Sequence, residues 1–244
     1  LQQARNGWSY EATRVCCTRI LMSKADTIDA LMDSAIQSFS RCGYEGASLR
    51  DIARDADVPL STIHLYFGSK AELFSAVSHK AWNEIDHERG VLLQQALSKH
   101  GERPPLLGDL IYALAFPVVR RALSKNEREL AQIYIVRSHT AHLQYFRDGG
   151  NSPLIDVADR SVVRWIDAMM LSCPTLSRQD VIWAFSFVVG SIYSWQLIDH
   201  RYDRLLGPDI ERKPEDVAGD IVAFCASGIE AIVARRNAER GLSR

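Results

Sequence analysis

The chain has 244 residues, of which 47% are hydrophobic and 24% are charged, and its formal net charge is −1. This composition is typical of a folded protein with one large or two smaller domains, and it excludes an intrinsically disordered chain. A net charge near zero also excludes a polycationic protein that coats nucleic acid through bulk charge. The five cysteines are odd in number and have no CxxC spacing, so we expect neither a disulfide framework nor a structural zinc site.

The sequence favours a soluble, cytoplasmic protein. Its polar N-terminal segment has no signal-peptide core. We assign residues 1–23 to an N-terminal extension, which is either a flexible arm or a stretch upstream of a natural start at Met22. Residues 181–198 carry no charge, but they include three serines, one glycine and one glutamine and are flanked by Asp180 and Asp199. We therefore predict a helix buried inside protein there, not a membrane span.

Apolar side chains recur at helical spacing along almost the whole chain, and no segment shows the alternation of a strand. The N-terminal third predicts four helices: one that ends near residues 42–46, two short ones at 48–56 and 59–67, and one that begins at Ser69. The remainder predicts five more helices, over 105–124 with a kink at Pro117, 127–147, 153–172, 178–200 and 215–237. We therefore predict an all-α fold.

Local signals mark the ends of the two short helices. Ser48 followed by Asp51 is similar to a capping box at the start of the first. Asp57 lies where the chain must turn sharply, and Asp tolerates the left-handed backbone conformation better than most residues. Pro59 is a suitable first residue for the second short helix. This pair, followed by a long helix, has helix-turn-helix spacing.

The second short helix has an outer face that suits DNA. The side chains expected to point away from its core are Ser61, Thr62, His64, Leu65 and Tyr66. Short hydroxyl and aromatic groups in this place suit base edges and phosphates in a major groove. On spacing alone, the alternative is a plain corner between two packing helices.

Residues 43–58 (GYEGASLRDIARDADV) and 66–73 (YFGSKAEL) resemble the DNA-binding segment of the tetracycline-repressor family of transcriptional regulators. The similarity covers about residues 26–75. It implies a helix-turn-helix DNA-binding domain over 24–90 and a larger ligand-binding and dimerisation domain over 91–244. It further implies a homodimer that binds palindromic operator DNA, represses transcription and is released from the DNA by a small molecule. We expect neither a cofactor nor an enzymatic activity.

The resemblance also implies which residues contact DNA. These are Arg50 in the first short helix, Lys70 at the start of the long helix, and the recognition-helix residues Leu60, Ser61, Thr62, His64, Leu65 and Tyr66. Pro59 and His64 depart from the family pattern, because a polar cap and a phosphate-binding tyrosine are common at these positions. Residues 1–90 contain 10 Lys+Arg and 12 Asp+Glu, so DNA binding must depend on the placement of individual cations.

The C-terminal part of the chain is rich in aromatic and methionine side chains. Each is more often a core residue than a ligand contact, but together with a few polar anchors they predict an apolar pocket. The predicted lining is Tyr112, Phe116, Tyr134, Arg137, His139, Trp165, Met169, Trp183 and Phe187. Such a lining favours a mostly apolar or aromatic effector. His139 and His142 have no third ligand at suitable spacing, so we predict no metal site.

The resemblance assigns the last two helices to the homodimer interface. Apolar residues surround the helix at 181–198, which requires burial on more than one side. The predicted interface residues are Phe185, Val189, Ile192, Ile221, Cys225, Gly228 and Ile232. The alternative is that both helices form only the core of one chain.

Two other classes of function remain as alternatives. One is a dimeric helical scaffold that binds protein and has a degenerate DNA-binding domain. The other is a helical enzyme, for which the sequence offers no nucleophile motif, phosphate loop or metal triad.

Overall fold

The computed structural model describes residues 23–145, 153–206 and 212–241, apart from the side chains of 138–145, 153–157 and 195–206. The described residues form nine helices and no strand. The helices are α1 (Lys24–Gly46), α2 (Leu49–Asp55), α3 (Leu60–Phe67), α4 (Lys70–Ser98), α5 (Leu107–Ala122), α6 (Glu127–Tyr145), α7 (Pro153–Ser172), α8 (Arg178–Leu206) and α9 (Pro214–Glu239). The prediction of an all-α fold is confirmed.

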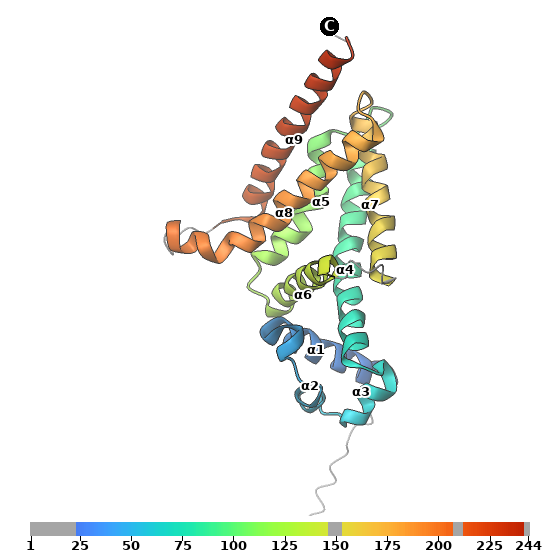
Figure 1. The fold of residues 1–244 in the computed structure, drawn as a ribbon, viewed down its shortest axis with the longest axis vertical. Coiled ribbons are helices and arrows are strands. Elements are labelled where there is room, and N and C mark those ends of the chain that lie inside the picture. Colours follow the sequence, from blue (N-terminus) through green and yellow to red (C-terminus); the bar gives the residue numbers. More distant parts are fainter. Residues whose placement is uncertain (1–22, 146–152, 207–211, 242–244) are drawn as a thin grey trace, which may run out of the picture.

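The molecule is elongated, and helices α1–α3 lie together at one end of its long axis (Figure 1). We call α1–α3 and the first turns of α4 the head, and the remaining helices the body. Helix α4 runs without interruption from the head into the body, so the domain boundary that we place at residue 90 lies inside this helix. The C-terminal end of α9 lies at the opposite end of the molecule from the head.

Apolar side chains from all four of its helices fill the core of the head. Leu31 of α1, Ile52 of α2, Ile63 of α3 and Leu73 of α4 are each fully buried. The rings of Phe39 and Phe74 meet edge to face beside them, with centroids 5.0 Å apart. Because the short helices have few buried residues of their own, this shared core fixes their orientation.

The observed caps differ from the predicted ones at both short helices, and Pro59, predicted as the first residue of α3, is its N-cap instead. Ser48 precedes α2 but makes no capping hydrogen bond with its side chain. The predicted capping box is therefore wrong, because Asp51 forms an ion pair with Arg54 one turn later, 2.6 Å apart. A capping box does occur at the start of α1, where Ser23 and Asp26 each accept from the other's backbone N–H.

The last two helices bury one side of themselves and leave another side open. Val181, Val188 and Ile192 of α8 are buried in the chain's own core, as are Ile221 and Ile229 of α9. Burial of the charge-free helix on more than one side stays a prediction for the dimer, because one chain alone leaves Trp183 and Phe187 exposed.

Among the described residues, α9 is the helix long and apolar enough to cross a membrane by length and composition. Only 28% of that apolar stretch is buried within the chain. The core helix of a protein that does not enter a membrane passes the same test. One face of α9 packs in the core, and Phe224 on another side is 75% exposed in the single chain.

Candidate nucleic-acid interface

The turn between α2 and α3 sets the angle at which α3 projects from the head. Asp57 adopts the left-handed conformation with φ 53°, as its side chain allows. The N–H of Val58 donates to the carbonyl of Ala53 at 2.9 Å, which closes the turn. The hydroxyl of Ser34 on α1 donates to the carbonyl of Ile52 at 2.9 Å, which ties α2 to the first helix. This bracing holds α3 in one position relative to α1.

Helix α3 presents a short exposed face centred on Ser61 and Leu65. These two residues are one turn apart, so they share a face that points away from the buried Ile63. Pro59 lies at the N-cap, one residue before the helix begins. The other predicted contacts that border this face are half-buried: Leu60, Thr62 and Tyr66. The structure therefore brings the predicted recognition-helix residues together, with Ser61, His64 and Leu65 exposed.

Lys70 is positioned at the N-terminus of α4 by contacts with the end of α1. Its Nζ donates to the carbonyl of Glu45 at 3.1 Å and lies 4.9 Å from the centroid of the Tyr44 ring. Ser69 caps the helix by accepting from the N–H of Glu72 at 3.2 Å. The ammonium group is thus held close to a helix N-terminus, where an anion is favoured.

The two arginines of α2 differ in their availability. Arg50 is exposed and makes no ion pair with any residue in the described part of the chain. Arg54 forms ion pairs with Asp51 and Asp55, and these carboxylates raise the pKa of its guanidinium. Arg50 is therefore the arginine that can reach a phosphate without breaking an internal pair.

One ring nitrogen of His64 already makes a hydrogen bond within the chain. Its Nδ1 lies 2.9 Å from the carbonyl oxygen of Gly68, which can only accept, so Nδ1 carries the proton of the neutral ring. The remaining nitrogen, Nε2, is then an acceptor and can donate to a phosphate only when the ring is protonated. This differs from tyrosine, which donates at any pH near neutrality.

A groove of about 960 Å³ lies between α8 and α9 on the exposed side of the body. Small side chains line its floor, spaced four residues apart along each helix: Ser186, Gly190, Ser194, Ala223 and Ser227. Phe187 and Phe224 line it as well and are 58% and 75% exposed. Ile182 and Trp183 are also exposed, at 44% and 59%. The groove is therefore an apolar surface that one chain leaves uncovered.

Several residues predicted for the dimer interface lie elsewhere. Phe185, Ile192, Ile221 and Cys225 are at most 8% exposed and pack in the core of their own chain. Phe185, Ile192 and Ile221 do not line the groove, and their assignment is corrected to core. Cys225, Gly228 and Ile232 do line it, and an added Cβ on Gly228 would meet no atom within 4 Å.

The residues predicted to line one effector pocket fall into separate groups. Tyr112 and Phe116 stack on α5 with ring centroids 5.0 Å apart, and Arg137 lies 5.0 Å from the ring of Tyr134 on α6. Trp165 and Met169 are 3% exposed in the core at α7. Trp183 and Phe187 are exposed on the open side of α8, so their assignment to an internal pocket is corrected. The side chains of His139 and His142 lie outside the described residues.

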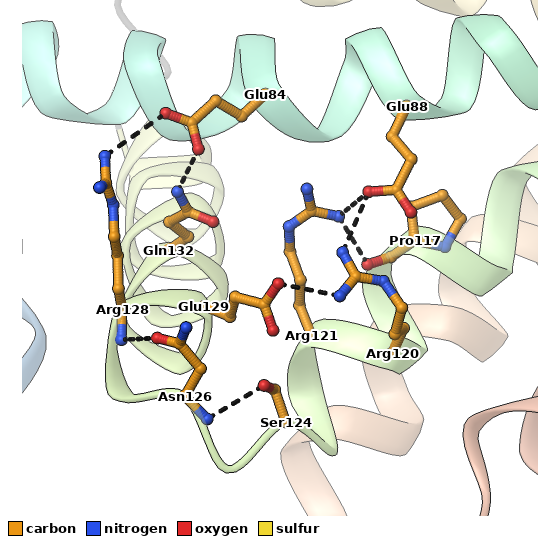
Figure 2. Close-up of polar contacts among 10 residues, drawn as sticks. All are labelled: Glu84, Glu88, Pro117, Arg120, Arg121, Ser124, Asn126, Arg128, Glu129 and Gln132. Carbon is orange, nitrogen blue, oxygen red and sulfur yellow. Dashed lines mark hydrogen bonds and ion pairs between the residues drawn. The ribbon is translucent and has the colours of Figure 1, made fainter.

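Two neighbouring sets of ion pairs and hydrogen bonds join α4, α5 and α6. We call them together the ionic corner, and its members are Glu84, Glu88, Arg120, Arg121, Arg128, Glu129 and Gln132 (Figure 2). In the first set, Arg121 Nη1 lies 2.5 Å from Glu88 Oε2 and donates to the carbonyl of Pro117 at 3.0 Å. Arg120 reaches Glu88 at 3.2 Å and Glu129 at 2.9 Å.

The same corner extends to the head. Arg128 on α6 lies 3.3 Å from Asp33 of α1 and 3.9 Å from Glu84 of α4. Lys80 of α4 pairs with Asp29 of α1 at 2.8 Å, and its hydrogen bond and charge lower the pKa of Asp29. The position of α1 is therefore tied by charge to both α4 and α6. Sequence reasoning missed this network because its members are far apart in the chain and each looks like an ordinary surface charge.

No group of three or more His, Cys, Asp or Glu side chains that could hold a metal ion occurs among the described residues.

Two family models match this chain. One, described as "Bacterial regulatory proteins, tetR family", matches residues 31–77, and one described as "Tetracyclin repressor-like, C-terminal domain" matches residues 147–228. Among curated proteins, the chain is 26% identical to the HTH-type nicotine-responsive transcriptional repressor HdnoR of Paenarthrobacter nicotinovorans in an alignment of 192 residues, and the match covers 62% of this chain and 99% of that protein.

Solved structures of similar fold agree with these matches. A TetR-like transcriptional regulator from Rhodococcus sp. RHA1 has a TM-score of 0.53 at 21% identity and covers 86% of this chain and 98% of its own. PfmR from Thermus thermophilus, a TetR family regulator, has a TM-score of 0.57 at 17% identity over 81% and 97% of the two chains. AibR, solved with isovaleryl coenzyme A and operator DNA, has a TM-score of 0.53 at 16% identity over 81% and 97%. At these identities the likeness concerns the fold alone.

Proposed function

This chain belongs to the tetracycline-repressor family of bacterial transcriptional regulators, and we propose that it is a homodimeric repressor released from palindromic operator DNA by a small, mostly apolar effector. The observation that carries the proposal is the exposed face of α3, with Ser61 and Leu65 at its centre, on a head braced in one orientation. We assign the DNA contacts to this face, with Arg50 and Lys70 as the cations beside it.

A homodimer supplies the second head that a palindrome requires. Two heads related by twofold symmetry would read half-sites spaced by about one helical turn of DNA, ~34 Å, or a multiple of it. Selection of DNA fragments from a randomised pool, followed by electrophoretic retardation, tests this directly. Recovery of an inverted repeat supports the proposal, and failure of the wild-type protein to retain any duplex overturns it.

Replacement of Lys70 by Gln should weaken binding to all DNA sequences alike and lower the salt dependence of log Kd by about one unit. Glutamine keeps a hydrogen-bond donor at this position, where the lysine donates to the carbonyl of Glu45, and removes only the charge. Lys125→Ala is the control, because this exposed lysine follows α5 in the body. The test is to measure the Kd for operator DNA against NaCl concentration for wild type, Lys70→Gln and Lys125→Ala. An unchanged slope for Lys70→Gln would remove Lys70 from the phosphate contacts.

The effector is assigned to the body. One relative, HdnoR, is named a nicotine-responsive repressor, and AibR was solved in complex with isovaleryl coenzyme A. In this chain, α5 and α6 carry part of the ionic corner as well as aromatic groups. Of these, Tyr112 has its pKa raised by burial and by the charge of Glu215 on α9, so its hydroxyl is neutral at physiological pH. The chemistry offered is apolar with few anchors, which favours an aromatic or aliphatic effector over a sugar or nucleotide.

A compound that acts as effector should raise the melting temperature of the free protein and lower its retention of operator DNA. Both effects follow from linkage, since a ligand that binds the DNA-free state tenfold better shifts the equilibrium by about 1.4 kcal/mol per site. The assay is a thermal-shift screen of apolar and aromatic compounds, followed by retardation with each compound that stabilises. A compound that stabilises the protein and leaves DNA retention unchanged would not be the effector.

A regulator of this kind acts through binding alone, and we propose no enzymatic activity for it. Its DNA partner places it in the cytoplasm. The exposed apolar face of α9 is then explained by a second copy of the chain, not by a lipid bilayer.

A further inference from the structure

Leu65 is the most exposed large apolar side chain that the structure describes, at 76%. It lies at the middle of the outward face of α3 and takes no part in the groove between α8 and α9. Its helix is otherwise well packed, since Ile63 on the opposite face is fully buried. An isobutyl group in this position gains nothing from the fold of its own chain, so its use has to be sought in what the face binds.

The neighbours of Leu65 define what kind of contact it can make. Ser61, one turn earlier on the same face, supplies a hydroxyl that can donate or accept. Leu65 itself has no polar atom, so it cannot hydrogen-bond to a base edge or a phosphate. Any discrimination it provides must come from an apolar group on the DNA.

The major groove offers one such group among the four bases. Thymine carries a methyl group at C5, whereas adenine, guanine and cytosine show only donors and acceptors there. Resting on the proposed function of α3, we propose that Leu65 contacts the C5 methyl group of one thymine in each operator half-site and thereby makes that position prefer a T·A pair. Leu65 is then a specificity-determining residue, distinct in role from Arg50 and Lys70, which meet the backbone.

Uracil tests this contact by a single change, because it lacks the methyl group and keeps the pairing edge and O4 of thymine. Each thymine of the selected operator is replaced by uracil in turn, in one half-site and then in both. We expect one position per half-site at which wild-type affinity falls about fourfold, and about sixteenfold when both half-sites are changed, as loss of one buried methyl contact predicts. At the same position, 5-methylcytosine should bind better than cytosine.

The variant Leu65→Ala identifies the residue that makes the contact. This variant should bind the thymine operator more weakly than wild type does. It should also bind the thymine operator and the operator with uracil at that position with equal affinity. Leu65→Met should keep the discrimination, since a long apolar side chain remains. Leu171→Ala is the matched control, because Leu171 is 55% exposed on α7 of the body, and it should behave as wild type. Substitution of the exposed Leu65 removes no contact from the buried core, and the melting temperature of each variant verifies that it is folded.

The outcomes separate this inference from the proposed function. If no uracil substitution changes the affinity of wild-type protein for its operator, the proposed role of Leu65 is overturned, while the proposal that the protein binds DNA still holds. If Leu65→Ala discriminates between thymine and uracil as strongly as wild type does, another residue makes the methyl contact, and the proposed role of Leu65 is overturned as well. Wild-type protein that retains no duplex overturns the function and this inference together.

Discussion

Replacement of Phe224 by Asp should convert the protein from a dimer to a monomer that no longer retains operator DNA. Phe224 is 75% exposed in the single chain and lines the groove between α8 and α9, so its loss removes few contacts within the monomer. In a twofold interface the change occurs twice. Two buried aromatic anchors at ~2 kcal/mol each would raise the dissociation constant by roughly a thousandfold.

A second variant on α9 gives an independent measure. Gly228 lines the same groove, and an added Cβ there meets no atom of its own chain within 4 Å. Gly228→Leu should therefore stabilise the isolated helix by up to about 1 kcal/mol, through helix propensity, and still block association by filling the groove. Opposite effects on monomer stability and dimerisation distinguish an interface residue from a core residue.

The control is Val163→Asp on α7, which places the same charge on an apolar residue that is 45% exposed outside the groove. Sedimentation velocity at micromolar concentration and circular dichroism are the measurements. Ile192→Glu is unsuitable for this purpose, because Ile192 is fully buried and the variant would lose its fold. A Phe224→Asp protein that still sediments as a dimer would place the interface elsewhere.

The sequence predicts the helices well because the signals that define them are local. The nine predicted helices all occur, and α7 has the same bounds as predicted, Pro153–Ser172. Helix α8 continues beyond its predicted end at 200 to Leu206. Asp57 adopts the left-handed conformation that its position in the turn demands. Apolar spacing, caps and turn residues act over a few positions, so one sequence is enough to read them.

The choice of face on α8 could not be made in the same way. Apolar side chains occur all round this helix, so periodicity does not tell Phe185 and Ile192 from Trp183 and Phe187. Only packing against the rest of the chain decides that the first pair lies inside and the second outside. The small residues Ser186, Gly190 and Ser194 at intervals of four are the one available signal, because such a stripe permits close approach of another helix.

The ionic corner is the other feature that the sequence could not predict. Glu88 and Arg121 are 33 residues apart, and neither residue type is unusual for a helix surface. The pairing exists because α4 and α5 pack together and place Arg121 in a site where its side chain is 9% exposed. Long-range electrostatic contacts of this kind depend on tertiary structure, which local patterns do not specify.

Replacement of Glu88 by Gln should lower the free energy of unfolding by about 3 kcal/mol at neutral pH. The variant keeps the size and polarity of the side chain and removes the charge that faces the buried guanidinium of Arg121, 2.5 Å away. Removing one partner of a buried pair leaves an uncompensated charge, which is the costly outcome. Arg121 is poorly compensated otherwise, because its Nε is buried and has no hydrogen-bond partner in the described structure.

The matched control is Asp167→Asn. Asp167 and Arg178 are 2.6 Å apart, but their side chains are 58% and 51% exposed, so the loss should be below about 1 kcal/mol. Combining Glu88→Gln with Arg121→Met removes the buried charge together with its partner and should recover much of the lost stability. Urea unfolding of these variants and wild type measures each difference. A Glu88→Gln protein no less stable than Asp167→Asn would show that the corner contributes little.

The pH dependence of the same difference gives a second, independent check. Burial acts to raise the pKa of Glu88, but the hydrogen bonds and charges of Arg120 and Arg121 outweigh it, and the pKa is lowered from its ordinary value. A carboxyl group whose pKa is lower in the folded state stabilises the fold fully above its unfolded pKa, ~4.3, and loses that contribution as pH falls through the folded pKa. The stability gap between wild type and Glu88→Gln should therefore be constant near neutrality and close in acid. Because Arg120 pairs with Glu88 of α4 and with Glu129 of α6 and so joins both helices to α5, effector-induced release from DNA should weaken in Glu88→Gln as well. A gap that widens in acid would mean that the charge of Glu88 opposes folding, and the ionic corner would then not be the element that holds the head to the body.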